Sequence, residues 1–234
     1  MSDKPVQYLL YTHPHVESTG GASAFPESAL VIASSQTHEA LVDASSDLAG
    51  ETRRRLRAAD DWSAPPRVPA EVVIGSTLRL VDGKHTVELL PLQGGHYPGH
   101  VVVRIEAEGF YYVGSLISTD RNPFADVVHS DLRSWVNALN ALSVLRPETI
   151  VPLRGEPVEA DRIRRFRDSL VWVVGQVENA FIEGVATDEI LAFAMDSPKL
   201  AEYFDLEADP SFVDTLFRSA FEQALDERRK REVP

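Results

Sequence analysis

Short apolar runs separated by turn residues dominate the first two thirds of the chain, and this pattern predicts β-strands. The runs lie at 7–11, 30–33, 72–81, 85–92, 101–106, 110–113 and 149–152. Asp82-Gly83 predicts a hairpin turn between the runs at 72–81 and 85–92. Ala107-Glu108-Gly109 is expected to join the next pair of runs.

Helical spacing of apolar residues appears between these runs and takes over after residue 157. A helix with a solvated face is expected within 37–60. Ser130 is expected to cap another helix, in which Trp135 and Leu139 belong to an apolar stripe typical of a core. Further helices are predicted at 159–183, 187–195 and 211–229. Strands with interspersed helices, followed by a helical tail, indicate an α/β class.

Composition narrows the classes of function. The chain has 234 residues, 44% hydrophobic and 25% charged, which is typical of one globular domain. With 36 acidic and 23 basic residues its formal charge is −13, so neither nucleic acid nor a membrane surface is an expected partner. The first residues carry no signal-peptide pattern, and we expect a cytoplasmic protein. Because the chain has no cysteine, any metal must be held by His, Asp or Glu.

Two segments carry candidate metal chemistry. His13-Pro14-His15 follows the first apolar run, within the sequence Thr-His-Pro-His-Val-Glu-Ser-Thr-Gly-Gly. From a strand end or tight loop, both imidazoles can point toward one position, as metal ligation requires. A second segment, Gly-Gly-His-Tyr-Pro-Gly-His, contains His96 and precedes another apolar run. Taken alone, the second segment is weak evidence for a metal site, but the evidence is stronger because this segment follows the first.

These segments resemble, in order and spacing, the metal-binding motifs of the metallo-β-lactamase superfamily, including its glyoxalase-II-like members. The resemblance extends from residue 8 to residue 155 and includes the segments 111–115 and 151–155. It implies an αββα sandwich, here truncated at its N-terminus. The expected domain covers 1–157, and a helical extension at 158–234 is expected to pack on it. The resemblance also implies that His13, His15 and His96 hold one metal ion.

The positions that hold a second metal ion in this family differ here. They read Glu17, Ser18, Ser115 and Arg154. Serine is a poor neutral ligand and arginine cannot deprotonate to bind a metal, so the second ion is expected to be absent. Glu17 is a candidate fourth ligand or general base, and Arg154 a candidate site for a substrate anion or oxyanion. A structural ion pair between the two is the alternative.

Three further polar residues bear on the site. His100, at a variable position of the second motif, is expected to play a structural or supporting role. Asp120 and His129 follow the Gly-Ser strand and are candidate replacement ligands.

The expected function is a mononuclear hydrolase or related lyase that activates water against a small ester, thioester or lactone. Zinc is the expected metal, while iron and a metal-free site remain open. Apart from the metal, no cofactor is expected. The alternative is a non-catalytic subunit or ligand-binding module that keeps a degenerate site as scaffold, and a third option is an iron enzyme that uses oxygen.

The first predicted strand raises the question of partners. Members of the family carry strands ahead of the first histidine motif, and this sequence shows only about a dozen residues there. We therefore expect the strand at 7–11 to form an exposed sheet edge, which is a liability in a monomer. A homo-oligomer, or a hetero-oligomer with another chain, is expected to cover it; a different packing of the helical tail is the alternative.

Overall fold

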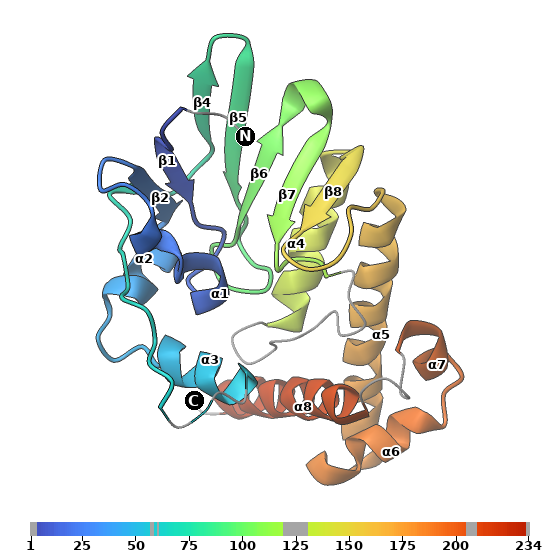
Figure 1. Cartoon of the computed structure of the whole chain (residues 1–234). Helices are drawn as coiled ribbons and strands as arrows, with labels where there is room; N and C mark the ends of the chain where they lie inside the picture. Colours follow the sequence, from blue (N-terminus) through green and yellow to red (C-terminus); the bar gives the residue numbers. More distant parts are fainter. Residues whose placement is uncertain (1–3, 57–58, 60, 119–130, 205–209, 233–234) are drawn as a thin grey trace.

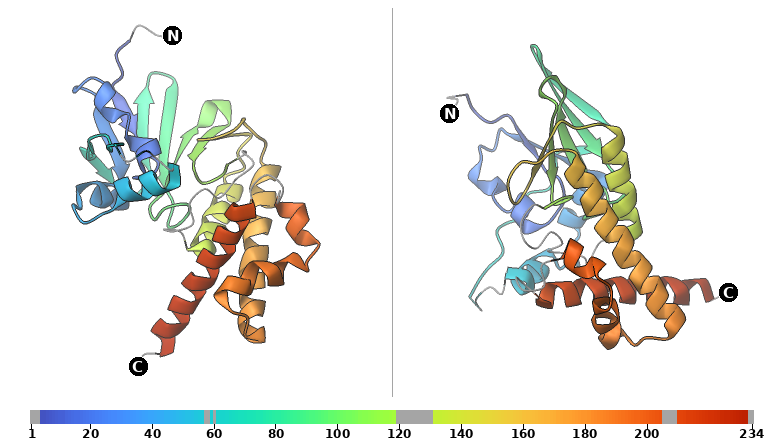
Figure 2. Two further views of the ribbon diagram at one scale, coloured as in Figure 1. Left: turned by 60° about the horizontal axis from the view of Figure 1, so that its bottom comes forward. Right: turned by 90° about the vertical axis from the view of Figure 1, so that its right-hand side faces the viewer.

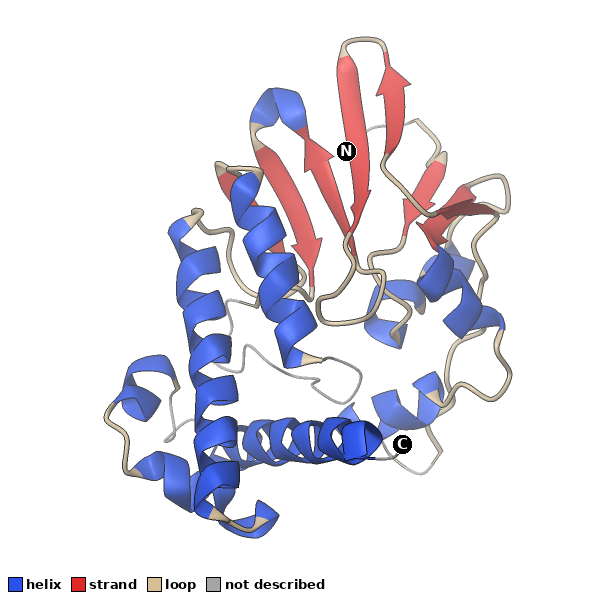
Figure 3. Ribbon diagram, turned by 180° about the vertical axis from the view of Figure 1, so that it is seen from behind, coloured by secondary structure: helices blue, strands red, loops and turns tan. Residues whose placement is uncertain are grey.

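Two β-sheets pack face to face, and helices cover the outer face of each sheet (Figures 1 and 3). The structure is a computed structural model that describes residues 4–56, 59, 61–118, 131–204 and 210–232. The α/β class and the sandwich architecture predicted from the sequence are confirmed.

The smaller sheet has the order β1-β2-β3 and is parallel throughout. Its strands are β1 (Tyr8–Leu10), β2 (Leu30–Ser34) and β3 (Val72–Ile74). From Val31 onward, strand β2 is buried without interruption because both of its faces are covered. Strand β1 is an edge strand within the described part of the chain, as expected, and Tyr8 is 44% exposed.

The larger sheet has the order β4-β5-β6-β7-β8. Its strands are β4 (Leu78–Asp82), β5 (His85–Pro91), β6 (Val101–Ile105), β7 (Phe110–Gly114) and β8 (Thr149–Pro152). The first four are antiparallel, and β8 runs parallel to β7. Both predicted connections are confirmed, since Gly83 and Gly109 each adopt a left-handed φ of 59° at the turn.

The predicted strand at 72–81 is wrong as a single element. Its first half is β3, which pairs with β2, and its second half is β4, which pairs with β5 in the other sheet. The chain crosses between the sheets around Gly75. Side chains of both halves, such as Val72 and Leu80, pack into the core between the two sheets. The apolar pattern therefore continues across the break and gives no sign of it.

The described helices fall into an N-terminal group on the side of the smaller sheet and a C-terminal group that continues the core of the larger one. They are α1 (Val16–Thr19), α2 (Ser35–Val42), α3 (Leu48–Leu56), α4 (Leu132–Val144), α5 (Asp161–Glu183), α6 (Ile190–Met195), α7 (Lys199–Tyr203) and α8 (Pro210–Glu232), with short 3-10 turns at Ala22–Ala24, Glu106–Glu108 and Thr187–Glu189. Helix α2 packs on the three-stranded sheet, and α3 joins the same core through Leu48, whereas α4 and α5 lie on the side of the five-stranded sheet (Figure 2). No membrane-spanning segment is present among the described helices.

Two helix boundaries differ from the predictions. The single helix expected within 37–60 is two helices, because Asp43 ends α2 and its carboxylate accepts hydrogen bonds from the backbone and side chain of Ser45. The N-cap of α4 is Asp131, whose carboxylate accepts from the backbone N–H groups of Arg133 and Ser134. Ser130, the predicted cap, lies outside the described residues.

One continuous apolar cluster connects the larger sheet to the helical segments that follow it. It runs from Tyr111 in β7 through Trp135 in α4 and Leu170 in α5 to Phe217 in α8. All four side chains are buried. A separate core, with Ile32 among its members, fills the space between the sheets. The helices after residue 157 are therefore built into the core.

Candidate metal centre

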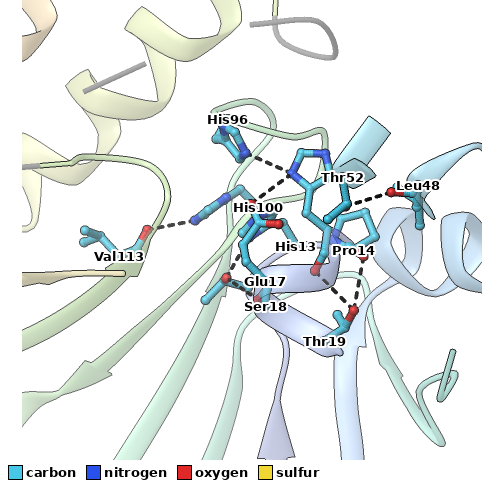
Figure 4. A network of polar contacts seen from close by, with 12 residues as sticks. His13, Pro14, Glu17, Ser18, Thr19, Leu48, Thr52, His96, His100 and Val113 are labelled. Atoms are coloured by element: carbon cyan, nitrogen blue, oxygen red, sulfur yellow. Dashed lines mark hydrogen bonds and ion pairs between the residues drawn. The ribbon is translucent and has the colours of Figure 1, made fainter. Parts of the chain in front are cut away.

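Four side chains meet beyond the end of β1 (Figure 4). His13 and His15 lie in the turn after β1, Glu17 lies on α1, and His96 lies in the loop between β5 and β6. One ligand atom from each residue lies within 4.8 Å of the other three. The convergence of the three histidines predicted from the sequence is thus present, and Glu17 joins them. We call this set the four-residue cluster.

Backbone contacts bring the two histidine segments together. The N–H of Val101 donates to the carbonyl of Thr12 at 2.8 Å, which ties the end of β1 to the start of β6. The N–H of Leu92 donates to the carbonyl of His100 at 2.8 Å and closes the loop that carries His96. This loop also lies directly against α4: a Cβ at Gly94 would lie 2.6 Å from the carbonyl oxygen of Ser134, so only glycine fits there.

The three imidazole rings stand edge to face around a shared centre. Their centroids are 4.9 to 5.0 Å apart and their planes cross at 78° to 90°. Nδ1 of His15 lies 3.0 Å from Nε2 of His96. Glu17 Oε1 lies 3.9 Å from both Nε2 of His13 and Nδ1 of His15. His13, His15 and His96 are 0%, 1% and 3% exposed, whereas the side chain of Glu17 is 19% exposed. The carboxylate therefore forms the open side of the cluster.

These residues fit a single divalent metal ion. Nε2 of His13 is buried and has no hydrogen-bond partner among the described residues, which costs about 1–3 kcal/mol in the absence of a ligand. Three imidazole nitrogens with one carboxylate oxygen form a donor set that suits zinc, and imidazole also suits iron. A dication at the centre gives each nitrogen lone pair a partner at once.

His100 supports the cluster from behind. Its ring stacks on His13, with centroids 5.4 Å apart and planes at 18°, and its Nε2–H donates to the carbonyl of Val113 at 2.8 Å. Burial, and secondarily the charge of a protonated His13, lower the pKa of His100 to about 3. The ring is therefore neutral at ordinary pH, and the structural role expected for His100 is confirmed.

Two neighbours of the cluster were not assigned a role at the site from the sequence. Thr12 Oγ1 lies 2.9 Å from Nδ1 of His13 and 3.1 Å from Ser18 Oγ. Trp135, predicted only as a core residue, contacts the His96 ring edge-on at 5.6 Å, and its Nε1–H donates to the carbonyl of Leu116. The position of Thr12 directly before His13 could have indicated a contact with that histidine, whereas no sequence feature links Trp135 to His96.

The remaining predicted site residues lie around the ends of the sheet strands. Ser18 is half-buried on α1, and Ser115 is half-buried directly after β7. Arg154 is exposed in the segment after β8. The catalytic role predicted for Arg154 stays a prediction. Asp120 and His129 lie outside the described residues.

Comparison with known proteins identifies related sequences and folds. A family model described as the metallo-beta-lactamase superfamily matches residues 1–153. A metallo-beta-lactamase from Pontibacter korlensis is 21% identical, with a TM-score of 0.56 over 71% of this chain and 70% of that chain. An archaeal metallo-beta-lactamase superfamily protein from Sulfolobus tokodaii is 16% identical, with a TM-score of 0.55 over 71% of this chain and 68% of that chain. No curated protein matches significantly.

A longer structure matches more of the chain. The stereoselective inverting sec-alkylsulfatase Pisa1 from Pseudomonas sp. is 14% identical, with a TM-score of 0.72 over 95% of this chain. The chain spans only 42% of the length of that protein. At these identities the solved structures establish the fold alone, and the alkylsulfatase extends the shared fold to helices after residue 157.

Proposed function

Because the chain belongs to the metallo-beta-lactamase superfamily, we propose that it is a hydrolase, or a related lyase, that uses one metal ion against a small ester, thioester or lactone. The observation that carries this proposal is the four-residue cluster, whose ligand atoms lie within 4.8 Å of one another. His13, His15 and His96 are the proposed ligands, and zinc is the proposed metal.

The metal and the protein divide the chemistry between them. When bound, a zinc ion supplies Lewis acidity and makes hydroxide available near neutral pH. Glu17 borders the cluster from its partly exposed side, so its carboxylate can orient a water molecule and accept its proton, or act as a fourth ligand. The buried imidazole rings exclude water from the inner side.

Arg154 is the proposed anchor for a substrate anion. It is exposed after β8, where a guanidinium can bind a carboxylate or phosphate through two hydrogen bonds. A second metal is proposed to be absent, because Ser18 is a weak ligand and its hydroxyl lies within hydrogen-bond distance of Thr12. A cytoplasmic location also stays a prediction.

Metal analysis of protein purified without a histidine tag tests this proposal. We expect about one zinc ion per chain, the stoichiometry of a mononuclear site. His13→Ala and His96→Ala should lose the ion, because each removes one of three strong ligands. His85→Ala, at an exposed histidine on β5, is the matched control and should retain it. Metal-free wild-type protein would contradict the proposal and favour a ligand-binding module or a non-catalytic subunit.

Activity measurements on the metal-loaded protein separate the two roles of Glu17. A panel of small chromogenic esters, thioesters and lactones identifies the substrate class. If Glu17 is the base, Glu17→Gln keeps the zinc and lowers kcat by roughly 10²- to 10⁴-fold. If Glu17 is a ligand, the same variant loses metal affinity. Zinc-loaded protein that is inactive on the whole panel would exclude the proposed substrate class.

A further inference from the structure

Thr12 is held in place from several sides. Its carbonyl accepts the hydrogen bond from Val101, and the residue is 1% exposed. Its side chain packs against the backbone of Gly114, where an added Cβ would lie 2.7 Å from Thr12 Oγ1 and 3.1 Å from Cγ2. Gly114 also has a left-handed φ of 55°, so this close approach requires glycine. The Thr12 hydroxyl therefore has little freedom to turn.

The single proton of this hydroxyl can go to only one of its two neighbours. If Thr12 donates to Nδ1 of His13, the ring proton sits on Nε2, which cannot then bind a metal. That buried N–H would have no acceptor among the described residues, since Glu17 Oε1 is 3.9 Å away and beyond hydrogen-bond reach. If instead Nδ1–H donates to Thr12, the hydroxyl is free to donate to Ser18.

The second arrangement gives both the Nδ1–H of His13 and the hydroxyl of Thr12 an acceptor. The Nδ1–H of His13 then donates to Thr12 Oγ1 over 2.9 Å, and the Thr12 hydroxyl donates to Ser18 Oγ over 3.1 Å. This arrangement leaves the lone pair of Nε2 directed into the four-residue cluster. No charged group takes part in it.

We propose that Thr12 and Ser18 are positioning residues that fix His13 in the Nδ1–H tautomer, so that Nε2 is ready to bind a metal ion. The use of this tautomer rests on the proposed function, whereas the tautomer itself does not. Ser18 stands at a position that resembles the family's second-metal histidine. In this chain the same position supports the single remaining metal position through Thr12.

Four variants test the proposal. Thr12→Val removes the hydroxyl and keeps the shape, whereas Thr12→Ser keeps the hydroxyl. Ser18→Ala removes the acceptor of the Thr12 hydroxyl. Thr52→Val is the matched control, because Thr52 is also buried near the cluster but its hydroxyl donates to the helix carbonyl of Leu48 at 2.8 Å (Figure 4).

The first measurement is the tautomer of His13 in the metal-free full-length protein, read from two-bond correlations between ring nitrogens and ring protons at slightly alkaline pH. Wild type, Thr12→Ser and Thr52→Val should show protonated Nδ1. Thr12→Val should move the proton to Nε2 or give a mixture, and Ser18→Ala should give a smaller shift in the same direction. Protonated Nε2 in the wild type, or an unchanged tautomer in Thr12→Val, would overturn the proposal.

The second measurement is zinc affinity, determined by competition with a chromophoric chelator. Loss of a group that orients a ligand typically weakens metal binding 10- to 100-fold, which we expect for Thr12→Val. Thr12→Ser should recover most of this loss, and Thr52→Val should bind as the wild type does. Equal losses in Thr12→Val and Thr12→Ser would show that retaining the hydroxyl does not preserve zinc binding, and would overturn the proposal. A wild type that binds no zinc would refute the proposed function, while the tautomer measurement would still decide the inference.

Discussion

The buried imidazole of His100 links the cluster to the strand behind it. Its ring stacks on His13 and its Nε2–H donates to the carbonyl of Val113 in β7. Both contacts hold the ring in a fixed orientation, and burial keeps it neutral by lowering the pKa of His100 to about 3. Protonation of this one residue therefore opposes the folded state.

Acid sensitivity of folding should reflect His100. Its pKa falls from 6.5 in the unfolded chain to about 3 in the fold, so between these pH values only the unfolded chain binds the proton. The contribution of His100 to the free energy of unfolding is therefore fully present above pH 6.5. As pH falls toward 3, this contribution decreases by up to a few kcal/mol.

Urea unfolding of the metal-free protein at a series of pH values measures this effect. His100→Gln keeps a donor for Val113 and should flatten the acid side of the stability profile. His85→Gln, at an exposed site, should leave the profile unchanged. Equal acid slopes in wild type and His100→Gln would show that His100 does not carry the effect.

At the residue scale, sequence reasoning found the groups that face the centre but not those that hold them. His13, His15, Glu17 and His96 could be selected because their spacing matches a known pattern. Thr12 acts through a hydroxyl whose partner depends on the turn geometry, and Trp135 reaches His96 from a helix far along the chain. Such contacts are set by tertiary packing, which spacing does not encode.

Among the elements that carry no residue of the four-residue cluster, α4 contacts the cluster directly. Its Trp135 contacts His96, and its backbone at Ser134 leaves room only for glycine at position 94. The first turn of this helix is capped by Asp131, whose carboxylate accepts from Arg133 N at 3.0 Å and Ser134 N at 3.2 Å. The cap therefore stabilises the turn that braces the His96 loop.

Replacing the cap should destabilise the protein measurably. Asp131→Ala leaves the first backbone N–H groups of α4 without their acceptor and should lower the free energy of unfolding by about 1 kcal/mol. Asp131→Asn keeps a good capping side chain and should lie close to the wild type. Urea unfolding curves of the three proteins provide the measurement. Alanine and asparagine variants of equal stability would argue against a capping role.

Element types were easier to predict than element boundaries. The strand predicted at 149–152 matches β8, because its short apolar run has a clear end at Pro152. The break between β3 and β4 was missed, since side chains on both sides of Gly75 enter the same core. The break between α2 and α3 depends on a local turn at Asp43, and periodicity alone does not show such turns.

At the scale of the whole molecule, β1 leaves one edge of the smaller sheet unpaired in the described fold. Val6, Tyr8 and Leu30 are 39%, 44% and 41% exposed along this side of the smaller sheet. An edge strand offers unpaired backbone N–H and C=O groups to another chain. The oligomer predicted from the sequence stays a prediction, and this edge is the surface on which we expect it to form.

Multi-angle light scattering of the purified protein tests that expectation. We expect a mass above that of the 25.9 kDa chain, or a second chain that co-purifies. Tyr8→Lys places a charge at the edge and should reduce the association. Val144→Lys changes a residue that is 79% exposed on α4 and should not. A monomer at all concentrations, with no co-purifying chain, would contradict the expectation.

The cluster draws its ligands from both layers of the sandwich. His13 and His15 follow a strand of the smaller sheet, whereas His96 precedes a strand of the larger one. An ion held by all three would thus cross-link the two sheets, which the polypeptide connects covalently only through loops. Binding that is confined to the folded form adds its free energy to stability. The lifetime of this protein against proteases would then follow the local supply of free metal, even with no substrate present.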